Sequence, residues 1–283
     1  MLMLIGLTVV VVLTVAAVCL QVLRRGDRRA DERAAAVLMH SAALAPQTFD
    51  PAMVADLPEP ARRYFAYAIQ PGTPLRMVAE VEMTGELGLG SRERANYLPM
   101  TGRQVLRLDG FVWQVRAGAA AMWVSGSDGY VDAEGWTRFW LYDAIPVARA
   151  GGGDDFARSA AGRAVAESLF WTPAALLPSP KVRWEAVSVD TSRAIVSLAG
   201  HEHHVELTVA ADGRPLSVSL MRWSRENPEK RWRLQPFGGT IRSMMEVDGY
   251  RVAEAVEGGN WFGAPDYFPF YRARVTRIQL HPG

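Results

Sequence analysis

The first 23 residues contain the feature that most constrains this chain. Residues 2–23 carry no charged side chain and are mostly Leu, Val, Ile and Ala. As a helix, such a run rises about 33 Å at about 1.5 Å per residue, and the hydrocarbon core of a bilayer is about 30 Å thick. Because lipid offers no partner to an unpaired backbone amide, only a helix can cross with a run of this kind. We therefore expect a transmembrane helix over residues 1–23 and a soluble body tethered to the lipid bilayer by residues 2–23.

Four arginines, Arg24, Arg25, Arg28 and Arg29, follow the apolar run directly. Lys and Arg beside a span tend to stay in the cytoplasm, and no Lys or Arg precedes this run. Flanking charge therefore favours a single-span protein with a cytoplasmic body, although long domains can translocate regardless of charge and the extracytoplasmic side stays open. The arginines either contact anionic lipid headgroups, at about 1 kcal/mol per charge, or act only as a topology signal.

The composition argues against several classes of protein. The chain has 31 basic and 30 acidic residues and a net charge of +1, so no basic excess points to a nucleic-acid partner and no acidic excess points to disorder. Its single cysteine, Cys19, lies inside the apolar run, which rules out a disulfide within one chain. About 260 residues remain after the run, enough for one large domain or two small ones.

Residues 24–74 are predicted to form a juxtamembrane segment of short helices. Residues 27–45 are rich in Ala and begin with charged side chains, as in a helix or stalk. Asp50 before Pro51 is a helix-start signal, and Pro60 can open a second helix. In that second helix the apolar residues recur at helical spacing, and we expect the resulting stripe to pack in the core. The stripe comprises Ala61, Tyr64, Phe65, Ala68 and Ile69.

From Leu75 onward the period of the apolar residues changes from 3.6 to 2. This alternation predicts an antiparallel sheet with one buried face and one wet face. The clearest runs are 77–83, 111–116, 194–198, 205–209, 216–220 and 271–275. Asp-Gly pairs, which suit the positive φ of tight hairpin turns, stand at 109–110, 128–129, 212–213 and 248–249. We therefore predict a meander of long strands in a β-rich soluble domain over residues 75–283.

One helical insertion, at about residues 154–178, interrupts the strands. The glycines at 151–153 lead into it, Asp154 or Asp155 is expected to cap its helix, and a short second helix is expected to begin at Thr172. The predicted fold is α+β and mainly antiparallel β. It is a curved meander sheet or half-barrel whose concave side receives the insertion, preceded by the N-terminal transmembrane helix and the short helices.

Several stretches of the chain are distinctive as a set. They are residues 57–60, 63–65, 111–113, 170–180, 182–185, 247–249 and 269–272. Together they resemble an uncharacterised bacterial family of single-span, membrane-anchored proteins with a domain of unknown function. The resemblance implies a bacterial cytoplasmic membrane, and it transfers no catalytic residue because the family has none assigned. More loosely, the strand–helix–strand order is similar to the half-barrels of LolA- and LolB-type lipoprotein carriers, which hold acyl chains; this second likeness is architectural.

The sequence contains no nucleophile motif, dinucleotide-binding loop or phosphate-binding loop, and we expect no cofactor. The best metal-ligating candidates are His201 and His203, which would share one face of a strand. They could hold zinc if a carboxylate, His40 or His281 supplied a third ligand. Gly200 places the pair beside a hairpin turn, where histidines are usually solvated, so we favour solvated histidines over a metal site.

The nine tryptophans are the remaining signal. On a curved sheet, inward-pointing Trp side chains would line an apolar pocket, the usual form of a small-ligand site; a solid aromatic core is the alternative. The residues predicted to line such a pocket are Trp113, Trp123, Trp171, Trp184, Trp223 and Trp232.

These observations predict a membrane-anchored, non-enzymatic module. It would bind a lipid-like or other apolar ligand, or a protein partner, on a concave, aromatic-lined sheet. A membrane-anchored, metal-assisted hydrolase that uses His201 and His203 is one alternative, and a purely structural assembly protein is another.

Overall fold

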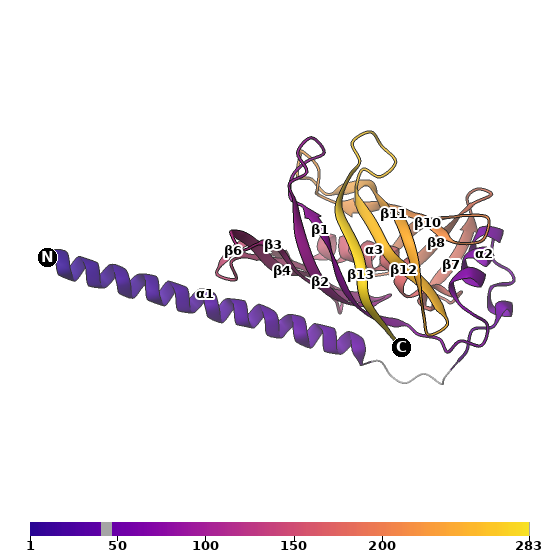
Figure 1. Cartoon of the computed structure of the whole chain (residues 1–283), viewed down its shortest axis with the longest axis horizontal. Coiled ribbons are helices and arrows are strands. Elements are labelled where there is room, and N and C mark those ends of the chain that lie inside the picture. The colour runs from indigo at the N-terminus through magenta and orange to yellow at the C-terminus, as the bar shows by residue number, and fades with distance from the viewer. Residues whose placement is uncertain (41–46, 283) are drawn as a thin grey trace.

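The computed structural model describes residues 1–40 and 47–282. It begins with one continuous helix, α1 (Leu2–Met39), whose N-terminal part extends away from the body and whose C-terminal part runs along it (Figure 1). The apolar side chains from Leu4 to Leu23 are mostly exposed, and in the described residues α1 is the one helix long and apolar enough to cross a membrane. The N-terminal apolar helix is therefore confirmed. It continues well past Leu23, and residues 41–46 of the predicted juxtamembrane segment lie outside the described residues.

Thirteen strands in the described residues form one open, antiparallel sheet. The first six are β1 (Val78–Gly88), β2 (Tyr97–Arg107), β3 (Gly110–Ala119), β4 (Met122–Val131), β5 (Glu134–Leu141) and β6 (Ile145–Gly151). The others are β7 (Val182–Ala186), β8 (Thr191–Leu198), β9 (His201–Val209), β10 (Pro215–Ser224), β11 (Arg233–Val247), β12 (Tyr250–Asn260) and β13 (Phe268–His281). The predicted α+β class with a curved, mainly antiparallel meander is confirmed.

The sheet consists of two meanders joined at its centre. Its order is β6-β5-β4-β3-β2-β1-β13-β12-β11-β10-β9-β8-β7, so β1 pairs with β13 and the edge strands β6 and β7 are joined by a helical connection. That connection holds α3 (Asp154–Trp171) and the 3-10 helix η2 (Pro173–Leu176), as predicted. α3 lies inside the curve of the sheet and contacts strands of both meanders (Figure 1).

Two short helices close one end of the curve. Asp50 caps η1 (Pro51–Val54) by accepting a hydrogen bond from the Ala52 amide, and α2 (Glu59–Ala68) has Pro60 in its first turn. The predicted apolar stripe of α2 is fully buried, and it packs against β7, β8, β9 and β12. Both helix starts and the core position of the stripe therefore agree with the sequence analysis.

Three of the four Asp-Gly pairs lie at hairpin turns, and one does not. Asp248 and Gly249 have φ values of 48° and 82° in the β11–β12 turn, while Asp109 and Asp212 lie in the turns before β3 and β10. Asp128 and Gly129 lie inside β4, so the turn predicted at 128–129 is wrong. Gly129 is needed there because an added Cβ would overlap the Trp136 ring.

The predicted aspartate cap of α3 is also wrong. The cap position is Gly153, and no side chain accepts a capping hydrogen bond there. Asp154 and Asp155 lie in the first turn, where their charge suits the positive end of the helix dipole. Both carboxylates contact the sheet instead. Asp155 accepts a hydrogen bond from Trp223 Nε1 of β10 at 2.6 Å, and Asp154 lies 3.2 Å from His201 Nε2 of β9.

The C-terminal part of α1 packs on the convex face of β2, β3 and β4. Leu38 is fully buried there, and three charged residues of α1 are buried with it. Arg24 binds Asp143 at 2.7 Å, Asp27 accepts a hydrogen bond from Trp140 Nε1 at 2.9 Å, and Asp31 lies 3.5 Å from Arg138. Because burial raises the pKa of Asp31, this contact carries an electrostatic cost that packing must offset.

This docking changes the interpretation of the arginines that follow the apolar run. Arg24 and Arg28 both form ion pairs with Asp143 on the β5–β6 turn, at 2.7 and 2.6 Å. Arg25 and Arg29 are exposed. The first pair therefore attaches the helix to the sheet, although Arg28 is itself exposed, and the second pair makes no ion pair with the sheet in the described residues.

Candidate functional site

A pocket of about 300 Å³ lies between the concave face of the sheet and α3. Ligand pockets in proteins span roughly 300–1,000 Å³, so this one is at the small end of the range. Most of its wall is apolar, and the lining residues come from eight strands and from α3. The main apolar contributors are Leu87, Trp113, Phe139, Phe170, Val218, Phe237, Ile241, Val256 and Phe270.

Glycines of two neighbouring strands form part of the pocket wall. Gly238 and Gly239 of β11 pair with Gly259 and Gly258 of β12, so this patch of the sheet carries no side chains. Gly238, Gly239 and Gly258 line the pocket. A Cβ added at Gly238 or Gly239 would collide with the backbone of a neighbouring strand, so these positions of the pocket wall need glycine. Glycine pairs inside two strand patterns were a signal for close approach or a hollow that the sequence analysis did not use.

A polar network forms one side of the pocket. Arg163 of α3 donates to Glu167 at 2.7 Å and to Asp128 of β4 at 3.2 Å. Gln104 donates to the other oxygen of Glu167, and Thr137 donates to Asp128 at 2.8 Å. Burial alone would lower the pKa of Arg163, but the two carboxylates raise it above its usual value. Every charge in this cluster therefore has a partner.

Arg222 of β10 is the exception on the pocket wall. Its Nε donates to the Ser159 carbonyl of α3 at 3.3 Å, and its guanidinium lies 4.9 Å from the centre of the Phe237 ring. Among the described residues, no carboxylate oxygen lies within 4.0 Å of it. Burial, together with the nearby Arg163, lowers the pKa of Arg222 to about 10. It therefore stays charged at neutral pH without a paired anion.

The pocket also contains two other titratable groups. Glu257 of β12 is paired with Arg242. Tyr271 of β13 donates its hydroxyl to the sulfur of Met83 at 2.8 Å, and burial raises its pKa. Tyr271 also packs edge-on against Trp113, whose Nε1 is buried without a hydrogen-bond partner among the described residues.

The six tryptophans predicted as ligand contacts lie in different places. Trp113 lines the pocket, and Trp223 lines a second, more polar hollow on the other side of Arg222. Trp171 and Trp184 lie in the core, where their ring nitrogens donate to the carbonyls of Ala253 and Leu176. Trp123 packs against Tyr142 and Arg116 at the tip of β4, and Trp232 packs against Phe156. The structure therefore brings only Trp113 of this set to the pocket beneath α3.

His201 and His203 share one face of β9, as their spacing predicts, and that face meets α3. His201 contacts Asp154, while His203 is buried and bonded to the Leu198 carbonyl at 3.2 Å. Desolvation lowers the pKa of His203 to about 4. In the described residues, no three His, Cys, Asp or Glu side chains are grouped as metal ligands. The expectation that both rings are solvated is wrong for His203, because α3 covers it.

The two other candidate ligands lie elsewhere. His40 ends α1, and His281 ends β13 with its ring 4.0 Å from Glu80. Neither residue joins the His201–His203 pair.

Comparison with known proteins places the chain in a family. The model of a family of unknown function, DUF6544, matches residues 47–273, well over half of the 283-residue chain. The chain belongs to this family. The resemblance to a family with a domain of unknown function is therefore confirmed, and the match covers the short helices, α3 and nearly the whole sheet.

Among solved structures, the chain is similar to a Vibrio parahaemolyticus domain described as an outer-membrane lipoprotein-sorting protein domain. The identity is 11%, the alignment covers 73% of this chain and 86% of that chain, and the TM-score is 0.34. A likeness of this extent carries no argument about function. A comparison with curated proteins found no match.

Proposed function

We propose that this protein is a membrane-anchored, non-enzymatic module that binds a small, lipid-like apolar ligand beneath α3. The observation that carries the proposal is the pocket itself. It is bounded by a curved sheet and a covering helix, its wall is mostly apolar, and a few polar groups converge at one side. This is the usual arrangement of a small-ligand site. Of the predicted contacts, the proposal keeps Trp113 as a direct ligand contact.

The anchor in this proposal is the N-terminal part of α1. We take residues 1–23 as the span, residues 24–74 as the segment that docks and closes the end of the sheet, and residues 75–283 as the β-rich domain with its insertion. The proposed location is a bacterial cytoplasmic membrane, with the body on the cytoplasmic side according to the flanking arginines. A tether of this kind raises the local concentration of the pocket near membrane ligands.

Native mass spectrometry of the full chain, extracted in mild detergent, tests the pocket. We expect a fraction of the protein to carry an additional small mass. Val218→Trp fills the pocket and should remove that mass, whereas Val189→Trp, at an exposed position on the β7–β8 turn, should retain it. Circular dichroism of each variant checks that it folds. A single ligand-free mass for the wild type, or equal retention in Val218→Trp, would contradict the proposal.

The location is tested separately by a C-terminal alkaline phosphatase fusion, which is active only outside the cytoplasm. We expect low phosphatase activity and, for a green fluorescent protein fusion at the same position, bright cells. The reverse pattern would place the body on the extracytoplasmic side.

A further inference from the structure

Arg222 sets a constraint on the ligand that pocket shape alone does not. It stands at the boundary between the apolar pocket and the more polar hollow beside it, and it lines both. The carboxylates on the pocket wall bind other arginines, because Glu167 and Asp128 pair with Arg163, and Glu257 pairs with Arg242. Arg222 therefore has no direct ion pair in the described residues. It is half-buried, and an anion brought by a ligand would supply the direct partner that its guanidinium lacks.

The geometry also limits the shape and charge of the ligand. Arginine binds a carboxylate through two parallel hydrogen bonds, and Arg222 uses only its Nε toward the protein in the described residues. A phosphate monoester carries nearly two charges at neutral pH and would bring more negative charge beside Glu167 and Glu257 than a carboxylate does. A carboxylate brings one negative charge to the one guanidinium without a direct ion pair. The small volume suits one hydrocarbon chain better than a lipid with several.

We propose, building on the apolar-ligand function above, that the ligand is a single-chain carboxylic acid. Its hydrocarbon chain lies over the glycine patch of β11 and β12, and its carboxylate pairs with Arg222 at the edge of α3. Phe237, against which the guanidinium packs, holds the cation in place at the mouth of the apolar part. The second hollow gives the head group its route to water.

Photolabelling of the full chain in lipid nanodiscs tests this assignment. The probes are a diazirine-bearing fatty acid and its methyl ester, which differ in charge and by one methyl group and both partition into the lipid. Labelling is read by mass spectrometry on the peptide that contains Gly238 and Ile241. The free energy of a hydrogen bond to a charged group corresponds to at least about a tenfold preference in binding. We therefore expect the acid to label the wild-type peptide at least about tenfold more than the ester.

Two variants complete the experiment. In Arg222→Gln, the acid and the ester should label the peptide equally. Arg277→Gln, which removes an exposed arginine of β13, should keep the wild-type preference for the acid. Equal labelling of the wild type by both probes, or an acid preference that survives in Arg222→Gln, would overturn the assignment of the acid and leave the apolar pocket standing. Absence of labelling by either probe would overturn the proposed function and this inference together.

A second inference rests on a different part of the molecule, the tips of two neighbouring hairpins. The β3–β4 and β5–β6 turns lie side by side, because the Tyr142 hydroxyl donates to the Ala121 carbonyl at 2.7 Å and the Tyr142 amide donates to the Trp123 carbonyl. Large apolar side chains are exposed there. Met122, Tyr142, Ile145 and Val147 are 42–54% exposed. We call these four residues, with Trp123, the hairpin tips.

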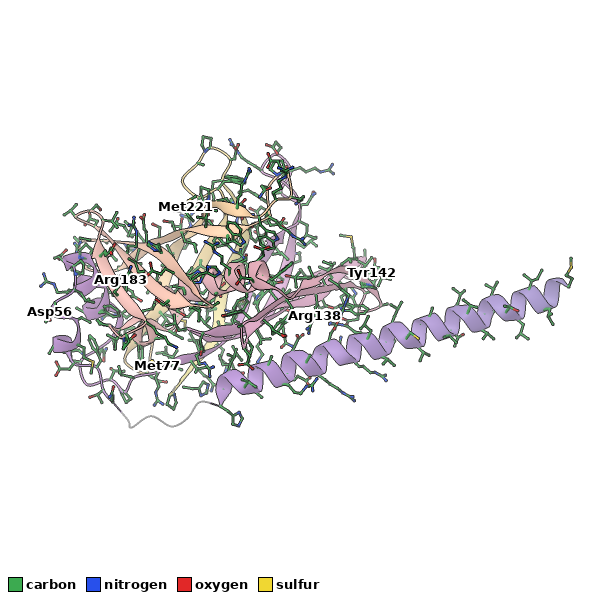
Figure 2. The ribbon with its side chains drawn as sticks, turned by 180° about the vertical axis from the view of Figure 1, so that it is seen from behind. Asp56, Met77, Arg138, Tyr142, Arg183 and Met221 are labelled. Carbon is green, nitrogen blue, oxygen red and sulfur yellow. The ribbon has the colours of Figure 1, made fainter. Side chains whose placement is uncertain are left out.

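The hairpin tips lie at the level where the apolar run of α1 ends. Gln21 donates to the Asp143 carbonyl at 3.4 Å, and Arg24 and Arg28 bind the Asp143 carboxylate. Figure 2 shows Tyr142 at the end of the body nearest the free part of the helix, far from Asp56. If residues 2–23 span the bilayer, the hairpin tips stand at its surface. Tyr and Trp are the aromatic residues enriched at that depth.

We infer that the hairpin tips insert into the headgroup region of the same membrane that α1 crosses. They make a second membrane contact and, with the docked helix, fix the orientation of the body on the bilayer. Arg116, which lies 3.6 Å from the centre of the Trp123 ring, adds a cation at the lipid surface. The inference depends on α1 as a span and is independent of the pocket.

Site-specific fluorescence quenching in nanodiscs tests this contact. In a Cys19→Ser background, a single bimane label is placed through Ile145→Cys, Val189→Cys or Val12→Cys. Val189 is the matched control, because it is an exposed apolar residue on the β7–β8 turn beside α2, at the other end of the body. With nitroxide-headgroup lipids we expect the label at 145 to be quenched at least about twofold more than the label at 189.

The label at Val12 reports the span with lipids that carry a nitroxide in the acyl chain. If the label at Val12 is quenched and the labels at Ile145 and Val189 are quenched equally, the hairpin tips do not contact the membrane. If the label at Val12 is not quenched, residues 2–23 do not span the bilayer, and the inference is wrong.

Discussion

Buried polar residues beneath α3 make the protein sensitive to pH at the level of single side chains. The pKa of His203 falls to about 4 in the folded state because the ring is desolvated, whereas a histidine in an unfolded chain titrates near 6.5. Above about pH 6.5 both states hold a neutral ring. Below it the unfolded chain takes up a proton first, so stability falls by up to about 3 kcal/mol until about pH 4 and then levels off.

His203→Gln should flatten this part of the profile. The measurement is the free energy of urea unfolding of the full chain in detergent between pH 4 and pH 7.5. His204→Gln, on the opposite and exposed side of β9, is the matched control, and only the His203 variant is expected to lose the slope. A wild-type profile without a decline between pH 6.5 and 4 would show that the ring is not desolvated.

Single residues also show where sequence reasoning reaches its limit. Trp113, Trp171 and Trp184 were all predicted as ligand contacts, and the structure places Trp113 on the pocket wall and the other two in the core. A ring nitrogen satisfied by a distant backbone carbonyl has no signature in the local sequence. Arg163 and Glu167 did have one, since an i, i+4 pair of opposite charge on a helix predicts an ion pair. What the sequence could not show is that Asp128 meets that pair from a strand.

At the scale of elements, the β11–β12 hairpin offers a test of how the segment before β1 packs against the sheet. Gly249 has a φ of +82°, and a Cβ added there would overlap Thr73 Oγ1. Gly263, in the β12–β13 loop, has a φ of +80° and open space around it. Gly263→Ala should cost about 1–2 kcal/mol from the left-handed backbone alone.

Gly249→Ala should cost at least about 1 kcal/mol more, because Thr73 must also move. The readout is the urea midpoint of each variant at constant slope. Equal losses in the two variants would mean that the segment before β1 does not pack against this turn. The comparison separates backbone strain from the contact that holds the juxtamembrane segment to the sheet.

Strand β9, which was predicted from its alternation, has one wet face, whereas β4, where a turn was predicted, is covered on both faces. β9 alternates cleanly between buried and exposed residues. β4 is buried at Ser125, Gly126 and Ser127 in succession, since α1 covers one face and α3 covers the other. A strand of this kind has no period of 2, so Asp128 and Gly129 resembled a turn. The sequence therefore predicted the meander and its insertion but not the helix that docks on the convex face.

For the molecule as a whole, the docking of α1 on the convex face decides whether the helix moves freely or keeps a fixed orientation relative to the sheet. Three buried charges of the helix, Arg24, Asp27 and Asp31, meet partners on β4, β5, β6 and the β5–β6 turn. Removing one member of a buried pair leaves the other without compensation, at a cost of several kcal/mol when the site is dry. Because Arg138 and Arg149 are partly exposed, the effect of each single change is smaller, and the three are best removed together.

Electron–electron distance measurements on the full chain in nanodiscs test this rigidity. Spin labels are attached through Arg33→Cys on α1 and Met221→Cys on β10, both exposed, in a Cys19→Ser background. Figure 2 shows Met221 on the body away from the helix.

We expect one narrow distance distribution in this background. Adding Arg24→Gln, Asp27→Asn and Asp31→Asn together should broaden it, because the helix then hinges relative to the sheet. The matched control, Arg25→Gln, Arg29→Gln and Glu32→Gln, changes three exposed charges of the same helix and should leave the distribution narrow. A broad distribution before any charge is removed would contradict the docked helix, and with it the fixed orientation of the pocket relative to the bilayer.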